Sequence, residues 1–105
     1  MTANNTINQA SSDYSAVVGG QYNSAQGFLA AILGGYANRS GGQCATVSGG
    51  LYNYAVGNYS SIGAGYSNQT NGFGSSVIGG QNNTAIPSYS MLPTYNPSSP
   101  TPRGI

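Results

Sequence analysis

Side chains that could carry out acid–base or nucleophilic chemistry are scarce in this chain. Its 105 residues include one Asp or Glu, one Cys and no His. Asp13 has no second carboxylate to share acid–base work, and Cys44 has no histidine to act as its base. Metal sites need clusters of Cys, His or carboxylate ligands, which this composition does not supply. The sequence therefore predicts a protein that is not an enzyme and that uses neither a cofactor nor a metal.

The low charge also limits the classes of partner. Charged residues make up 3% of the chain, against about 25% in an average globular protein. Arg39 and Arg103 alone cannot form the basic patch that binds a phosphate backbone, so nucleic acid is not an expected partner. Residues 28–33, the longest apolar run, are far fewer than the ~20 that span a bilayer, so no membrane contact is expected. A nearly uncharged surface suits a subunit that is covered by others in an assembly.

What the sequence contains in abundance is a fifteen-residue repeat. Five copies run from residue 16 to residue 90 without an insertion, and residues 5–15 read as a partial opening copy. A β-branched residue returns at one position of every copy, which gives the column Val17, Ile32, Val47, Ile62 and Val77. Self-similarity at a fixed period is the signature of stacked coils that bury their apolar side against their neighbours.

The local pattern within each copy indicates strands rather than helix. Ser15, Val17 and Gly19 alternate with the period of two that is typical of a strand with one face inward. A Gly-Gly pair follows and permits a tight turn, and a glycine density of about one in five argues against helix. The sequence therefore predicts an all-β fold, a short parallel β-roll or β-solenoid whose coils each hold two short strands and two turns.

An asparagine recurs three residues after the second glycine of each copy. The column consists of Asn23, Asn38, Asn53, Asn68 and Asn83. Stacked side-chain amides can bond from one copy to the next, as they do in cross-β assemblies. We expect these residues to form a hydrogen-bonded ladder along the roll.

A second column, next to the first, is aliphatic in part and is interrupted by Ser48 and Gly63. Residues adjacent in a strand point to opposite faces, so Val18, Leu33 and Ile78 should face outward if Val17 faces inward. In that position they would form a stripe for association with other copies. The alternative is that the three side chains form a second half of the internal core.

Both ends of the chain depart from the repeat. All five prolines lie in the last nineteen residues, and Pro87 takes a position that is glycine in the preceding copies. Because proline cannot donate to a β-ladder, the ladder should end near Ile86. Residues 1–15 are expected to form an N-terminal arm and the partial first repeat, residues 16–90 the roll, and residues 91–105 an extended Pro-rich tail. Such a tail is either a loose linker or an arm that grips a neighbour, and the arm is the favoured interpretation in an assembly subunit.

The tyrosines fall mostly in the turns. Tyr36 and Tyr66 share one column, and Tyr22 and Tyr52 share the next. Such rings can stack on sugars, or they can cover the roll and contact other proteins. The two columns are too irregular to indicate a sugar-binding patch common to several repeats, so protein contact is the favoured interpretation.

Repeats such as residues 60–68, Ser-Ser-Ile-Gly-Ala-Gly-Tyr-Ser-Asn, resemble the head repeats of trimeric autotransporter adhesins and repeats of phage and large-virus fibre and spike proteins. The resemblance covers about residues 5–90. It implies a left-handed roll that assembles as a three-fold homotrimer, with a stripe such as Val18, Leu33 and Ile78 packed on the axis. The adhesin repeat is usually one residue shorter, and the signal peptide, coiled-coil stalk and membrane anchor of a surface adhesin are not seen.

These observations favour a structural virion protein over an adhesin. We expect a trimeric β-roll that decorates a phage or virus capsid, or forms part of a tail fibre or spike, with tails that clasp neighbouring capsid or tail proteins. The alternatives are a receptor- or glycan-binding adhesive tip and a self-assembling filament subunit, either of them extracellular or on a cell surface. An ice-binding face would need a regular threonine array, which the sequence lacks.

Overall fold

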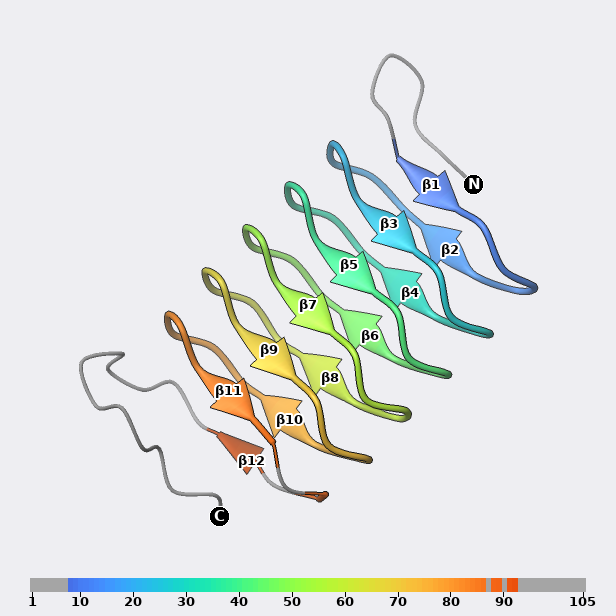
Figure 1. Cartoon of the computed structure of the whole chain (residues 1–105). Coiled ribbons are helices and arrows are strands. Elements are labelled where there is room, and N and C mark those ends of the chain that lie inside the picture. Colours follow the sequence, from blue (N-terminus) through green and yellow to red (C-terminus); the bar gives the residue numbers. More distant parts are fainter. Residues whose placement is uncertain (1–7, 87, 90, 93–105) are drawn as a thin grey trace.

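Two parallel sheets make up the computed structural model, which describes residues 8–86, 88–89 and 91–92. The strands are β1 Gln9–Ala10, β2 Ala16–Val17, β3 Ser24–Ala25, β4 Ala31–Ile32, β5 Arg39–Ser40, β6 Thr46–Val47, β7 Tyr54–Ala55, β8 Ser61–Ile62, β9 Gln69–Thr70, β10 Ser76–Val77, β11 Thr84–Ala85 and β12 Met91–Leu92. The six odd-numbered strands form one sheet, here sheet A, and the six even-numbered strands form sheet B (Figure 1). The part of the chain that the structure describes contains no helix.

Every strand pairs with the strand one repeat further along the chain. In sheet B, for example, Ala16 lies opposite Ala31 and Val17 opposite Ile32. In sheet A, Ser24 lies opposite Arg39. All pairs are parallel and offset by fifteen residues, because an insertion-free repeat can stack only at its own period. The predicted all-β parallel β-solenoid is confirmed.

A third line of contact follows the turns that lead from sheet B to sheet A. Isolated parallel bridges connect Gln21, Tyr36, Leu51, Tyr66 and Gln81 in succession. The first four of these residues donate their amides to a glycine carbonyl of the next coil, as Tyr36 does to Gly50 over 2.9 Å. The turns are therefore hydrogen-bonded to one another, and they form a continuous edge along the roll (Figure 1).

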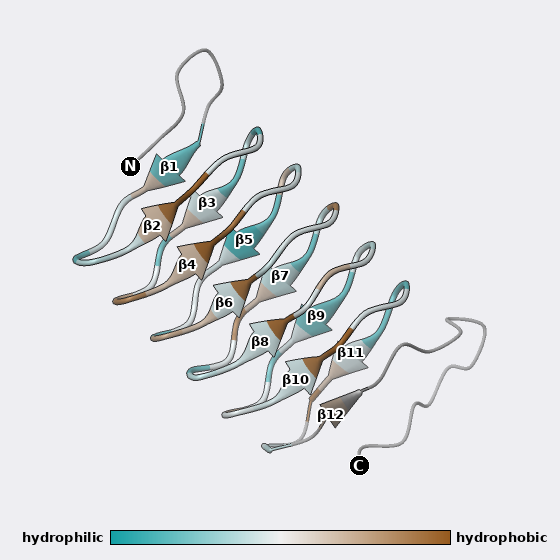
Figure 2. Ribbon diagram, turned by 180° about the vertical axis from the view of Figure 1, so that it is seen from behind, coloured by the Kyte–Doolittle hydropathy of each residue, from teal (hydrophilic) through white to brown (hydrophobic). Residues whose placement is uncertain are grey.

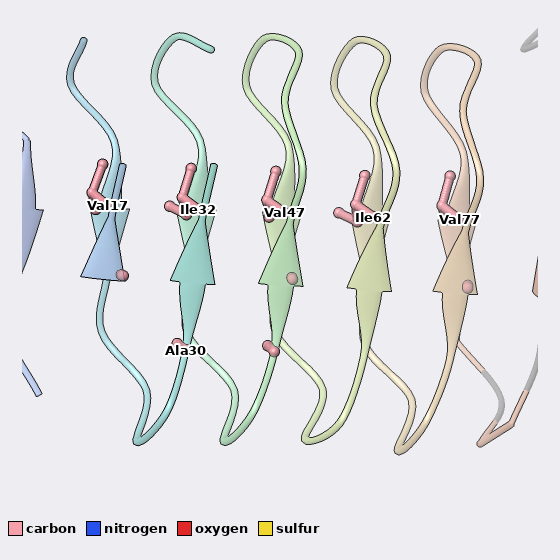
Figure 3. Close-up of a cluster of buried hydrophobic side chains, with 10 residues drawn as sticks. Val17, Ala30, Ile32, Val47, Ile62 and Val77 are labelled. Carbon is pink, nitrogen blue, oxygen red and sulfur yellow. The ribbon is translucent and has the colours of Figure 1, made fainter. Parts of the chain in front are cut away.

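The interior of the roll is one side chain wide. Val17, Ile32, Val47, Ile62 and Val77 are buried and stand above one another along sheet B (Figure 3). They give that sheet its apolar band, whereas the strands of sheet A are more polar (Figure 2). Small buried residues face them: Ala25, Ser40, Ala55, Thr70 and Ala85 from sheet A, and Ala30, Ala45, Ser60 and Ser75 from the turns.

The hydroxyl groups of this interior have partners. Ser40 donates to the carbonyl oxygen of Ala45 over 2.8 Å, and Thr70 donates to the hydroxyl of Ser60 over 2.9 Å. Ser60 donates in turn to the carbonyl oxygen of Gly57 over 2.6 Å. Serine and threonine can therefore replace alanine in the core, because each buried hydroxyl keeps a hydrogen bond.

The two sheets end at different points of the sequence. Sheet A ends with β11, close to the predicted end at Ile86. Sheet B continues, because Met91 pairs with Ser76 and Leu92 with Val77. The prediction that pairing stops near Ile86 is therefore wrong for sheet B, and β12 lies inside the segment expected to be an arm. Pro87 falls between β11 and β12 in the sequence and lies outside the described residues.

Most of the two expected arms lies outside the described residues, which leave out residues 1–7 and 93–105. Within the described part, no helix is long and apolar enough to cross a membrane.

Candidate interaction surfaces

The asparagine column forms a buried ladder that binds three coils together at each step. The side-chain amide of Asn38 donates to Oδ1 of Asn23 over 3.1 Å and to the carbonyl oxygen of Gly50 over 2.8 Å. Its own Oδ1 accepts a bond from the backbone amide of Asn53 over 2.9 Å. The same bond from backbone amide to Oδ1 joins Asn8, Asn23, Asn38, Asn53, Asn68 and Asn83 in order. The ladder is structural: its polar atoms face one another and the backbone, not solvent.

Glycine makes room for this ladder. Gly50 has a φ of 93°, which side chains other than glycine seldom adopt. A Cβ atom on Gly50 would lie 2.6 Å from Nδ2 of Asn53 and 2.7 Å from the backbone nitrogen of Gly65. The same clash recurs at Gly20, Gly35 and Gly65. The close packing of the ladder asparagine against the next coil therefore requires glycine at these positions.

The outer face of sheet B carries the second aliphatic column. Val18 is 68% exposed, Leu33 52% and Ile78 50%. The three side chains therefore lie on the outside of the roll and are not a second half of its core. The strand residues that share this face are Ala16, Ala31, Thr46, Ser61 and Ser76, which are small, and Met91, which is 39% exposed. The face is consequently nearly uncharged.

The outer face of sheet A is more polar. The guanidinium carbon of Arg39 lies 4.9 Å from the centre of the Tyr54 ring, and the Arg39 Nη1 donates to the Tyr54 hydroxyl over 3.2 Å. Gln69 donates from Nε2 to Oδ1 of Asn71 over 2.7 Å. The difference between the faces is one of degree, because the hydroxyls of Ser61 and Ser76 bond to each other on the outer face of sheet B, and Val56 and Ile86 are exposed beside the strands of sheet A.

Aromatic rings run along the edge formed by the turns from sheet B to sheet A. The ring centres of Tyr22 and Tyr36 are 5.5 Å apart, those of Tyr36 and Tyr52 6.0 Å, and those of Tyr52 and Tyr66 6.1 Å. The four rings, which we name the Tyr row, are 37% to 52% exposed. Two columns that look irregular in the sequence thus interleave, and each of four successive coils contributes one ring.

A second row follows the opposite edge but is interrupted. Tyr14 packs against Phe28 with 5.9 Å between ring centres. Phe73 lies 5.2 Å from Tyr59 and 5.6 Å from Tyr89. The coil between these two groups places Gln43 and the half-buried Cys44 at this edge and contributes no ring. The unbroken run of Tyr59, Phe73 and Tyr89 crosses three coils, whereas the Tyr row crosses four.

The backbone does not favour tyrosine at these turns. Tyr22 has a φ of 59° and Tyr52 a φ of 57°, both in the left-handed region. The left-handed conformation costs a residue with a Cβ atom about 1–2 kcal/mol in free energy, and after glycine this cost is smallest for asparagine. The same column holds Asn82 at a φ of 58°. Ala37 and Ser67 occupy the same column with φ values of 57° and 56°, so the left-handed backbone is a property of this turn in every coil.

The residues with catalytic potential do not gather into a site. Among the described residues, no group of three or more His, Cys, Asp or Glu side chains comes together to hold a metal ion. Asp13 and Cys44 lie two coils apart along the roll. No family model matches the chain, and no curated protein sequence matches it.

Proposed function

We propose that this chain is a non-enzymatic structural subunit of a virus or phage particle, a left-handed β-roll that assembles as a homotrimer on a capsid, tail fibre or spike. The observation that carries the proposal is the outer face of sheet B, where Val18, Leu33 and Ile78 stand exposed among small residues. Exposed aliphatic stripes are typical of surfaces that are buried on association. The terminal arms are proposed to clasp neighbouring subunits and particle proteins.

The chemistry of this face supports close packing of copies. Side chains no larger than threonine, as at Ala31 and Thr46, let a second sheet approach to the spacing of about 10 Å that is found between packed sheets. With 3% charged residues, such a contact traps few unpaired charges. Three copies related by a three-fold axis would each bury the same stripe.

Replacing Leu33 by aspartate is expected to convert the trimer to monomers. Each trimer would have to bury three unpaired carboxylates on its axis, at a cost of several kcal/mol per ion. Because Leu33 lies outside the core, the monomer itself should stay folded. Native mass spectrometry and circular dichroism of the two proteins measure these two properties.

The matched control is Val56→Asp, which adds the same charge to the exposed face of sheet A. This variant should remain trimeric. If Leu33→Asp also kept three chains, the face of sheet B would not be the subunit contact.

Location on a particle is tested separately. Particles purified on a density gradient, from the culture that expresses the chain, should contain it in a copy number that is a multiple of three. Recovery of the chain only from the medium or the cell surface would contradict the virion assignment and support the adhesive alternative.

A further inference from the structure

From the Tyr row and the residues beside it, we propose that this edge of the roll binds a linear, neutral polysaccharide of the β-linked glucan class. The proposal does not depend on the trimer or on the virion assignment. It concerns the edge formed by the turns that lead from sheet B to sheet A, not the outer face of sheet B (Figure 1).

The rings form a row along which a chain of sugars can lie. Four rings follow one another at 5.5 to 6.1 Å, with successive ring planes inclined by 66°, 72° and 51°, so a sugar chain would stack on individual ring faces and not on one flat platform. A pyranose ring presents an apolar face of C–H groups, which packs on an aromatic ring, and hydroxyl groups around its rim. A linear polysaccharide repeats that unit along its length, as the roll repeats its coil.

The side chains around the rings are neutral. The columns of the Tyr row also hold Gln21, Ser67, Gln81 and Asn82, which donate and accept hydrogen bonds without charge, together with the apolar Ala37 and Leu51. Neither column contains a charged residue. The surface therefore suits hydroxyl groups and offers nothing to pair with the sulfates or carboxylates of an acidic polysaccharide.

Beside the row lies a strip without side chains, which we name the glycine ledge: Gly19, Gly34 and Gly49. A Cβ atom at any of the three would meet nothing within 4 Å, and none has a positive φ. Ala64 occupies the same column, so the fold accepts a side chain there. Glycine at these positions is therefore not required by the roll, and it leaves room for a ligand to approach the backbone.

The shape of the edge favours a sugar chain over a protein. A stable protein interface buries about 800 Å² on each partner, which needs a broad patch. The Tyr row is one ring wide, and its four rings span three coil steps of about 4.8 Å each, or roughly 14 Å. A narrow ligand can contact the row and the ledge along their whole length, whereas a protein would contact only the outermost atoms of the rings.

The test measures binding of cellohexaose and laminarihexaose, a β-1,4- and a β-1,3-linked glucan, to the 105-residue chain by titration calorimetry. The Tyr row is removed with residues that the repeat itself uses in the same columns, Tyr22→Asn and Tyr52→Asn as at Asn82, and Tyr36→Gln and Tyr66→Gln as at Gln21. The four-fold variant should stay folded and bind at least about tenfold more weakly, since each lost stacking contact weakens binding several-fold. Gly34→Val, which fills the ledge, should weaken binding without touching a ring.

The matched control changes the interrupted row on the opposite edge. Phe28→Gln and Phe73→Asn use the residues found at Gln43 and Asn58 in the same column, and this variant should bind like the unaltered chain. Failure of the unaltered chain to bind either hexasaccharide would overturn the proposal. So would unchanged binding by the four-fold variant, or a loss of subunit association in that variant, which would make the row a protein contact.

Discussion

Replacing Gly50 by alanine is expected to destabilise the roll by at least about 3 kcal/mol, because two costs add. The left-handed backbone of residue 50 costs about 1–2 kcal/mol for any residue with a Cβ. The new methyl group would also overlap the carbonyl oxygen of Gly65 and crowd Nδ2 of Asn53. Neither neighbour is the free end of a flexible side chain, so the coils must separate to relieve the contact. Urea denaturation followed by circular dichroism measures the loss.

The control for this prediction is the preceding residue. A Cβ on Gly49 would meet nothing within 4 Å, and its φ is not positive. Gly49→Ala should therefore change the free energy of unfolding by less than about 0.5 kcal/mol. Equal losses in the two variants would show that the Gly-Gly pair is needed for general flexibility and not for the close approach of coils.

Replacing Asn53 by alanine is expected to cost about 3 kcal/mol or more. The Asn53 amide donates to the carbonyl oxygens of Gly49 and Gly65 over 2.9 and 3.0 Å, and its Oδ1 accepts from the backbone amide of Asn68 over 2.9 Å. Alanine leaves the Gly49 carbonyl and the Asn68 amide unpaired, and each such group costs about 1–3 kcal/mol. The Gly65 carbonyl loses one of its two bonds and keeps the one from the Leu51 amide. Hydrogen exchange should show the amide of Asn68 losing its protection first, because its acceptor has been removed.

Asn71 provides the matched control for the ladder. Its side chain is exposed and accepts a bond from Gln69 at the surface. Asn71→Ala should alter the stability by no more than about 0.5 kcal/mol. If Asn53→Ala were as mild as this control, water would have to replace the ladder, and the amides would not be holding the coils together.

The interior could be predicted from the sequence because it depends on a single period. Once Val17 is assigned to the inside of a coil, an insertion-free repeat places Ile32 and its successors there too. The same period aligns the asparagines, and strand alternation places Val18 on the outside. Each of these inferences needs only the column and the period of two within a strand.

The features that could not be predicted lie in turns, where alternation gives no guidance. The Tyr row arises because two adjacent turn columns point to one edge, so that Tyr22 in one column and Tyr36 in the next become neighbours. The sequence did contain a signal for the row, because the tyrosine changes from one of these two columns to the other in each successive coil. The left-handed backbone at Tyr22 and Tyr52 was also hidden, since residue preference assigns such positions to glycine or asparagine. The continuation of sheet B through β12 was missed because proline was taken to end both sheets together.

The mass of the full chain in solution tests the central proposal, a roll that associates through the face of sheet B. Light scattering behind size exclusion is expected to give a single species of three times the 10.6 kDa chain mass, at a ratio that does not change on dilution through the micromolar range. A species of one chain mass would contradict the trimer and leave the stripe of Val18, Leu33 and Ile78 without a partner of its own kind. Open-ended polymers would contradict it as well, because they would place the contact at the ends of the roll rather than on its face.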